Sequence, residues 1–271
     1  MLEYVDLARR ASKADYKTRL PWLQGRLHQL QQACWQSGVG SLLVFDGWTT
    51  SGKDSTIQKL TERLEPRGFD VHTIVAPRTL ERQMPWLWRF WTKVPDFGHM
   101  AIFRRSWNRR VLVERVEGEV GEAEWQRAYQ DISGFERTLA EDGYEVVKFF
   151  LHIDRDEQAE RLEKWRSDKS AAWQVKTDPV DFLHYDAYLE AAEDLLERTE
   201  AEWAPWFIIE ATDKRWLRLQ VFETAIRRLE EGLRRRGHEV PEPFEAAPAS
   251  NGNGNGSDNG NDAAPVEGEA S

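Results

Sequence analysis

The chain of 271 residues lacks several features that define common classes of protein. Its single cysteine, Cys34, cannot form a disulfide within the chain, which favours a reducing, cytoplasmic setting. No apolar run approaches the roughly 18 residues that a membrane-spanning helix needs, and the first ten residues do not read as a signal peptide. The six histidines show no ligand-like spacing, and His152, near the end of a strand-like run, is more readily explained as a structural residue.

Lysine and arginine are absent from residues 237–271, which carry seven acidic side chains. The formal net charge of −10 therefore belongs mostly to this segment, and the preceding 236 residues are close to neutral, with 37 basic and 40 acidic side chains. A nucleic-acid-binding protein is usually basic, so we expect no nucleic-acid partner. The stretch from Asn251 to Asp262 is rich in Asn and Gly and offers almost nothing to bury, so 237–271 is predicted to be a disordered acidic tail.

A phosphate-binding loop is the most informative feature that is present. The strand-like run Leu42–Asp46 leads into Gly47-Trp-Thr-Thr-Ser-Gly-Lys53, and a helical pattern follows from Asp54. Strand, glycine loop and helix form an anion cradle, because backbone N–H groups converge on the anion and the lysine adds a full positive charge. A strand-to-helix turn that merely needs small residues would also fit, but the flanking strand and helix favour phosphate binding.

Strand-like and helical segments alternate along the chain, which predicts an α/β fold with a parallel sheet covered on both faces. A helical pattern is also predicted at 14–37. The predicted strands are 41–46, 69–75, 99–104, 144–152 and 206–211, and the predicted helices between them are 53–65, 80–92, 121–142, 154–167, 178–199 and 213–236. Ligands of such sheets bind beyond the carboxyl ends of the strands, so the loop at 47–53 and the turns after Phe103 and Ile209 should open onto one edge.

Arginines cluster just after the third predicted strand. Five fall within twelve residues: Arg104, Arg105, Arg109, Arg110 and Arg115. Guanidinium groups match phosphate oxygens in geometry, so the cluster suits a polyanion or the phosphates of a nucleotide. A solvated helix face with Glu114 and Glu117 as ion-pair partners is the alternative, and the expected place at the sheet edge favours phosphate.

The sequence resembles the polyphosphate kinase 2 family of P-loop phosphotransferases from about residue 20 to residue 230. The matching segments are 46–56, 88–91, 105–107, 111–118, 148–153, 157–158, 186–188, 198–199, 204–206 and 213–215. The resemblance implies a P-loop kinase-like three-layer α/β/α fold with a five-stranded parallel sheet and a helical lid. It also implies phosphoryl transfer between inorganic polyphosphate and nucleoside mono- or diphosphates. The partners would then be polyphosphate and ATP, ADP or other nucleotides, the cofactor would be Mg²⁺, and the protein would form a homo-oligomer. The chain would then comprise an N-terminal helical segment (1–38), a phosphotransferase-like domain (39–236) and the tail (237–271).

The resemblance also implies roles for individual residues. The residues expected to be catalytic are Lys53, Arg105 and Arg115. The expected phosphate-binding residues are Gly47, Gly52, Lys53, Ser55, Thr56 and Arg110. The lid is expected at about 77–93 and 154–176, and its candidate chain-binding residues are Arg78, Arg82, Arg161 and Arg166. An ordinary solvated helix face would also explain these four.

Two positions depart from the family pattern where it has an aspartate. The family loop usually reads Gly-x-Asp-Ala-Ala-Gly-Lys-Gly-Gly, and Thr49 stands at its aspartate. The second motif usually reads Phe-Asp-Arg-Ser-Trp-Tyr, and Arg104 stands at its aspartate. These changes weaken a metal site and make the phosphate site more attractive to bare anions. Asp54 and Asp46 are candidate substitute metal ligands, although Asp54 is also explained by its favourable place at a helix N-terminus.

Three functions are compatible with these residues. We predict a phosphotransferase of the polyphosphate kinase 2 type with an altered metal site. A catalytically impaired family member that binds polyphosphate or nucleotide as a regulatory or partner protein is the alternative, and an ordinary small-molecule kinase would leave the run 105–118 unexplained. If the prediction is right, Lys53, Arg105 and Arg115 should converge on one cleft at the sheet edge, with Arg104 pointing toward the loop.

Overall fold

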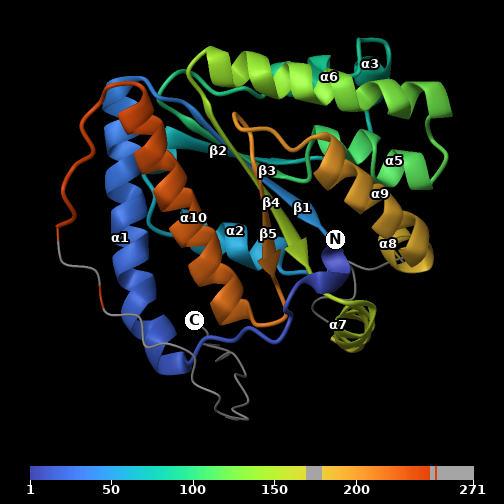
Figure 1. The fold of residues 1–271 in the computed structure, drawn as a ribbon, viewed down its shortest axis with the longest axis horizontal. Coiled ribbons are helices and arrows are strands. Elements are labelled where there is room, and N and C mark those ends of the chain that lie inside the picture. The colour runs from blue at the N-terminus through green and yellow to red at the C-terminus, as the bar shows by residue number, and fades with distance from the viewer. Residues whose placement is uncertain (169–178, 245–247, 249–271) are drawn as a thin grey trace, which may run out of the picture.

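A parallel sheet lies at the centre of the computed structural model, which describes residues 1–168, 179–244 and 248. Its strands are β1 Ser41–Gly47, β2 Phe69–Thr73, β3 Met100–Arg104, β4 Glu145–His152 and β5 Trp206–Glu210. They follow the order β2-β3-β1-β4-β5, and every neighbouring pair is parallel (Figure 1). Every residue of β1 and β4 is buried, because both strands run inside the sheet and helices cover its two faces. The predicted five-stranded parallel sheet is confirmed.

Helices form the outer two layers. The α-helices are α1 Lys13–Ser37, α2 Lys53–Thr61, α3 Thr79–Arg82, α4 Trp88–Trp91, α5 Val113–Val116, α6 Glu122–Glu141, α7 Arg155–Ser167, α8 Val180–Leu183, α9 Tyr185–Arg198 and α10 Lys214–Arg235. Short 3-10 turns lie at Leu2–Tyr4, Pro66–Gly68 and Trp107–Arg110. In Figure 1, α1 and α10 lie side by side on one side of the sheet, and α5, α6 and α9 lie on the other. Within the described residues, no helix combines the length and apolar character that crossing a membrane requires.

Helix α1 attaches the N-terminal segment to the rest of the fold. At its start the side chain of Ser12 accepts a hydrogen bond from the N–H of Asp15, and at its end Gly38 adopts a left-handed conformation with φ 71°. Leu27 and Leu30 are fully buried, and the helix packs against α10. The predicted helix at 14–37 is confirmed, and burial of its apolar stripe holds it in place.

Two predicted helices are interrupted. The segment 80–92 forms α3 and α4 rather than one helix, because Pro85 has no N–H to donate inside a helix. The described part of 178–199 forms α8 and α9, separated by His184, whose φ of −120° and ψ of 49° lie outside the helical region. Residues 169–178, which include the last part (169–176) of the predicted lid, lie outside the described residues, and so do 245–247 and 249–271 of the predicted tail.

The carboxyl ends of β1 and β3 meet where the phosphate loop begins. The two strands pair up to Phe45 and Arg104, and the N–H of Arg105 donates to the carbonyl oxygen of Phe45 at 2.9 Å. The chain leaves β1 toward α2 and β2, but it leaves β3 toward α6 and β4. In open α/β sheets, ligands bind at such a switch point between diverging connections.

Candidate phosphate-binding site

Both ends of the loop between β1 and α2 require glycine. Gly47 has φ 115°, and a Cβ there would lie 2.3 Å from the carbonyl oxygen of Leu151. Gly52 has φ 98° and directly precedes α2. A residue with a side chain would be strained at either position. The glycines therefore let the loop turn below the N-terminus of α2, where free N–H groups and the helix dipole favour an anion.

Lys53 is held over the loop by the loop's own carbonyl groups. Its Nζ donates to the carbonyl oxygens of Gly47 at 2.7 Å and of Trp48 at 2.6 Å, and its side chain is buried. Burial, and then the nearby positive charge of Arg105, lower the pKa of Lys53 to about 7. A phosphate oxygen beside Nζ would favour the charged form. Binding of an anion would therefore raise the pKa of Lys53 and keep the lysine protonated.

Two residues with side chains adopt left-handed backbone conformations at this edge. Thr50 in the loop has φ 68°, and Arg105 after β3 has φ 59°; elsewhere in the described ranges only glycines have positive φ. Such conformations cost of order 1–3 kcal/mol each and tend to cluster at functional sites. Among the described residues, no hydrogen bond or ion pair engages the guanidinium of Arg105. The sheet edge thus holds a cation that none of the described residues engages.

A cavity of about 920 Å³ opens beside the loop, and we call it the loop cavity. The cationic side chains that line it among the described residues are Lys53, Arg104, Arg105, Arg161, Lys164 and Lys214. The one carboxylate that these residues place in its lining belongs to Asp54. Because six positive groups face one negative group, the field in the cavity favours a ligand with several negative charges. A chain of phosphates is such a ligand.

Arg104 points toward the loop, as predicted. Its Nη2 donates to Oδ2 of Asp54 at 2.9 Å, and its Nε donates to Oδ1 of the same carboxylate. The end of β3 is therefore connected to the first turn of α2 by a bidentate ion pair. Arg104 stands where the family motif has an aspartate, and Asp54 stands where the family loop has a glycine, so these two departures complement each other in charge.

Arg161 joins helix α7 to the loop. Its guanidinium donates to the carbonyl oxygens of Thr50 at 2.9 Å, of Ala211 at 2.9 Å and of Thr212 at 2.7 Å. The side chain thereby ties the loop after β1 to the turn after β5. A predicted lid arginine thus supports the cavity wall by ordering the backbone around it.

Asp181 contacts the loop from α8, although no sequence pattern singled it out. Its carboxylate accepts hydrogen bonds from the N–H of Thr49 and from Nε2 of Gln158, the latter at 3.0 Å. With Asp46 and Arg105, it lines a cavity of about 230 Å³ that shares lining residues with the loop cavity. Asp181 follows the undescribed segment 169–178 and has no motif around it, so only the fold shows that it reaches the loop.

Lys164 and Lys214 were also missed by the sequence reasoning. Lys164 lies on α7 and Lys214 begins α10, and both line the loop cavity. Burial and the neighbouring Arg161 lower the pKa of Lys214, as expected for a cation placed among other cations. The matched segment 213–215 was the signal that could have identified Lys214.

Some of the other predicted phosphate-binding and lid residues line the loop cavity, and the rest lie elsewhere in the fold. Ser55 lines the loop cavity, whereas Thr56 is fully buried on α2 and does not line it. Arg78 precedes α3 and Arg82 ends it, and neither lines the loop cavity. Arg166 on α7 lies 3.9 Å from a glutamate of its own helix. Of the four lid arginines, Arg161 alone lines the loop cavity within the described residues.

Asp46 and Asp54, the candidate metal ligands, do not share a site. Asp46 accepts hydrogen bonds from Oγ of Ser106 at 2.7 Å and Nδ2 of Asn108 at 2.9 Å, and burial raises its pKa. Asp54 is paired with Arg104. In the ranges that the structure describes, no three His, Cys, Asp or Glu side chains gather to hold a metal ion. Mg²⁺ prefers oxygen ligands that are free to coordinate it, so these residues do not fit the metal site that the resemblance implies.

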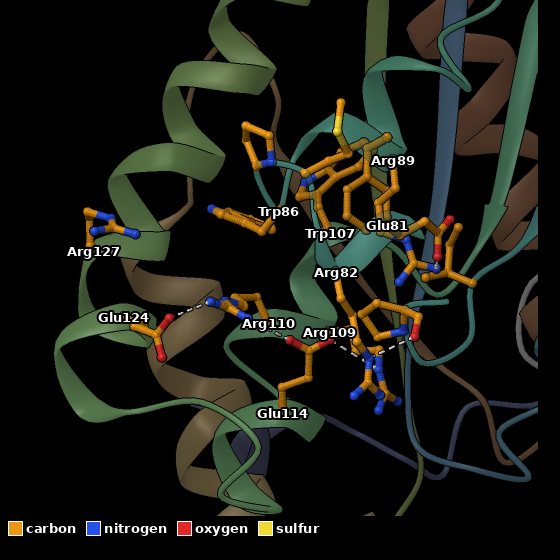
Figure 2. A pocket seen from close by; sticks show the side chains of 15 residues that line it. Glu81, Arg82, Trp86, Arg89, Trp107, Arg109, Arg110, Glu114, Glu124 and Arg127 are labelled. Carbon is orange, nitrogen blue, oxygen red and sulfur yellow. Dashed lines mark hydrogen bonds and ion pairs between the residues drawn. The ribbon is translucent and has the colours of Figure 1, made fainter. Parts of the chain in front are cut away.

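A second arginine-rich cavity, of about 460 Å³, lies beside α3 and α4 (Figure 2). We call it the tryptophan cavity, because Trp86 and Trp107 line it. Its charged lining comprises Arg82, Arg89, Arg109, Arg110, Arg127, Glu81, Glu114 and Glu124. Figure 2 shows Arg110 close to the ring of Trp86 and to both Glu114 and Glu124. Arg110 lies 3.3 Å from Glu114 and 3.2 Å from Glu124, and Arg109 lies 3.3 Å from Glu114. Arg110 is therefore neutralised by carboxylates and is not in the loop cavity.

Arg115 lies apart from the loop cavity, between α5, α6 and α9. It donates to Asp194 at 2.5 Å, to Glu190 at 3.0 Å and to the hydroxyl of Tyr129 at 3.1 Å, and it stacks 4.1 Å from the ring centre of Trp125. The expected convergence of three cations is thus corrected. Lys53 and Arg105 share one cavity, and Arg115 instead connects three helices, because carboxylates on α9 engage it.

The geometry defines a three-layer α/β/α fold of the P-loop kinase kind, with a glycine loop and a cavity lined by cationic side chains at its switch point. Residues 10–237 match the family model described as Polyphosphate kinase 2 (PPK2). The chain therefore belongs to the polyphosphate kinase 2 family.

Individual relatives agree with this assignment. A polyphosphate:AMP phosphotransferase of Pseudomonas syringae pv. tomato is 39% identical over 236 residues, which are 87% of this chain and 47% of that protein. An AMP/ADP-polyphosphate phosphotransferase of Meiothermus ruber is 37% identical over 72% of this chain and 74% of its own length. The crystal structure of a putative polyphosphate kinase 2 from Pseudomonas aeruginosa superposes with a TM-score of 0.83 at 37% identity, covering 86% of this chain and 50% of that one. The chain spans about half the length of the first curated relatives that it matches.

Proposed function

We propose that this chain transfers phosphoryl groups between inorganic polyphosphate and nucleoside mono- or diphosphates. The observation that carries the proposal is the loop cavity, where six cationic side chains face one carboxylate among the described residues. Phosphoryl transfer depends on holding the phosphates in line and on neutralising the charge that develops on the moving group. The names of the relatives from Pseudomonas syringae and Meiothermus ruber support the choice of polyphosphate and adenine nucleotides as substrates.

Lys53 and Arg105 are the side chains that we propose to contact the transferring group. Both line the loop cavity beside the turn between Gly47 and Gly52, whose backbone N–H groups can hold a neighbouring phosphate. Arg161 keeps this turn in shape through its bonds to backbone carbonyl groups. Arg110 and Arg115 are left out of the proposed set, because carboxylates outside the loop cavity already engage them.

Mg²⁺ is the cofactor that the family resemblance implies. We assign it no ligand here, because Asp54 is engaged by Arg104, and Asp46 lines a different cavity. The chemistry that a metal ion supplies when bound is the neutralisation of phosphate charge. The same need is met in this cavity by side chains, so activity should be measured both with and without divalent metal ions.

The test is a transfer assay on the purified full chain. Polyphosphate is supplied with AMP or ADP, and ATP is supplied alone for the reverse reaction, each with Mg²⁺, Mn²⁺ or EDTA. We expect formation of ADP or ATP that is lost in Lys53→Ala and kept in Lys59→Ala, a matched lysine of α2 that does not line the loop cavity. Polyphosphate binding without turnover under every condition would overturn the proposal in favour of an impaired, binding-only family member.

We also propose that the chain works in the cytoplasm as a homo-oligomer. Its single cysteine, Cys34, is buried, so the fold uses no disulfide and suits a reducing compartment. The aromatic side chains of Trp91, Phe97 and Trp203 are at least 40% exposed, and such surfaces favour contact between copies. Light scattering after size-exclusion chromatography measures the mass in solution, and a strictly monomeric mass would contradict the second part.

A further inference from the structure

The ion pair between Arg104 and Asp54 lies on the wall of the loop cavity. Its two bonds connect the end of β3 to the first turn of α2, and the side chains of Arg104 and Asp54 are 26% and 53% exposed. Both residues line the cavity, so both can be reached by a ligand there. In the resembled family these positions usually hold an aspartate and a glycine, so the chain carries a new cation and a new carboxylate that meet in space.

The other cations of the loop cavity have different partners. Lys53 donates to backbone carbonyl groups, and Arg161 and Lys164 each pair with a carboxylate of their own helix that is not in the cavity lining. Arg105 has no ion-pair partner among the described residues. Within that part of the chain, Arg104 is thus the cation that is neutralised by a carboxylate inside the cavity itself.

Such a pair can be exchanged because its two side chains are partly exposed. Water and ligands compete with each partner of a solvent-accessible ion pair, and the side chains lose entropy when they are held together. A phosphate oxygen can therefore replace the carboxylate at Arg104. Binding of a divalent cation is disfavoured instead. The cavity lining carries a net positive charge, and Asp54 could coordinate the cation only after its ion pair with Arg104 was broken.

We propose that the loop cavity binds condensed phosphate without a divalent metal ion, and that Arg104 exchanges Asp54 for a phosphate oxygen when it does so. This inference rests on the proposed function, because it takes the loop cavity as the phosphate site. Asp54 then competes internally for Arg104. A chain of phosphates that also contacts Lys53 and Arg105 displaces this carboxylate more readily than orthophosphate, so Asp54 acts as a specificity-determining residue for condensed phosphate.

The test is isothermal titration of the full chain with tripolyphosphate at constant ionic strength, in EDTA and in excess Mg²⁺. Orthophosphate is titrated in parallel. We expect tripolyphosphate to bind in EDTA at least as tightly as in Mg²⁺, because the metal ion neutralises part of the charge that the cavity recognises. Binding that requires Mg²⁺ would overturn the inference.

Two variants test the exchange at Arg104. Asp54→Asn should tighten tripolyphosphate binding in EDTA by about fivefold and should narrow its preference over orthophosphate, because the internal competitor is gone. Arg104→Gln should weaken binding by about tenfold, because a charged contact to phosphate is lost. Glu62→Gln, at the other end of α2 and outside the loop cavity, is the matched control and should leave affinity within about twofold of the parent chain.

Thermal unfolding of each variant without ligand shows whether it is folded. Asp54→Ser, which keeps a residue that is favourable at a helix N-terminus, replaces Asp54→Asn if that variant unfolds. Unchanged affinity in folded variants of both Asp54 and Arg104 would contradict the exchange.

The outcomes separate this inference from the proposed function. Mg²⁺-dependent binding with turnover would refute the inference and leave the function standing. Metal-free binding without turnover on any nucleotide would refute the proposed function and leave the inference standing. Absence of tripolyphosphate binding in both arms would refute the two together.

Discussion

The loop cavity and the tryptophan cavity are both rich in arginine, yet they differ in how these cations are neutralised. In the tryptophan cavity, three glutamates face five arginines, and Arg109 and Arg110 share Glu114. In the loop cavity, one carboxylate faces six cations among the described residues. The number of arginines in a segment therefore does not locate a phosphate site. The position of the carboxylates decides which cations are left for a ligand.

The origin of the side chains explains this difference. Arg110 and Glu114 lie four residues apart, and Glu124 follows shortly after, so the tryptophan cavity is neutralised by its near neighbours in sequence. The cations of the loop cavity come from α2, from the end of β3, from α7 and from α10. They converge because the sheet aligns the carboxyl ends of its strands. Arg161 and Lys164 keep carboxylate partners on their own helix, but these carboxylates do not line the cavity.

Removing the buried lysine of the loop cavity should have the largest effect. Lys53→Met is expected to weaken tripolyphosphate binding by about 2–3 kcal/mol, or roughly 30-fold to 150-fold, because charged hydrogen bonds to phosphate are lost. The free energy of unfolding without ligand should not fall, since burial already disfavours the charge of this lysine. Titration calorimetry and urea unfolding measure the two quantities, with Lys59→Met as the control. Normal binding by a less stable variant would show that Lys53 is structural.

Removing Arg115 should instead lower stability. Arg115→Met leaves Asp194 and Glu190 without their partner and removes the stacking on Trp125, so the free energy of unfolding should fall by about 1–2 kcal/mol. Tripolyphosphate affinity should stay within about twofold of the parent value. Urea unfolding and calorimetry check both points. A large loss of turnover at unchanged stability would contradict this expectation and support the original prediction that Arg115 is catalytic.

The pH dependence of binding should report on Lys53. Its pKa of about 7 in the ligand-free fold is below the ordinary lysine value, so above pH 7 the free cavity holds a neutral amine, and binding must take up a proton. Affinity for tripolyphosphate should therefore fall as pH rises, by up to about tenfold per pH unit. Ionisation of the ligand works in the opposite direction, because its charge grows with pH. In Lys53→Arg, whose side chain stays charged, affinity should no longer fall as pH rises. Affinity that rises with pH in the parent chain would contradict the proposal that Lys53 takes up a proton on binding.

The smallest effect is expected in the tryptophan cavity. Arg110→Met should leave tripolyphosphate binding within about twofold of the parent value and should lower the free energy of unfolding by about 1 kcal/mol. Glu114 keeps Arg109 as a partner, and Glu124 is half-exposed and can be solvated, which limits the loss. Measuring both quantities side by side with Lys53→Met tests the comparison directly. Binding that drops as far as in Lys53→Met would mean that both cavities hold phosphate.

Much of the site could be predicted from local pattern. The spacing from Gly47 to Lys53 predicted the loop, because glycine tolerates the positive φ that both of its ends require. Arg104 and Arg105 were placed at the loop because Arg104 ends, and Arg105 follows, a strand whose carboxyl end lies beside it. Arg110 lies outside the loop cavity although it is only five residues further on, because Glu114 and Glu124 engage it.

The sequence by itself determined the parallel α/β fold and the anion cradle after its first strand. Both depend on short-range properties, namely the periodicity of apolar residues and the backbone freedom of two glycines. Only the tertiary structure decided which cations remain for a ligand. That depends on which carboxylate reaches which guanidinium, and partners such as Asp54 with Arg104, or Arg115 with Asp194, are brought together by sheet register and helix packing across tens of residues.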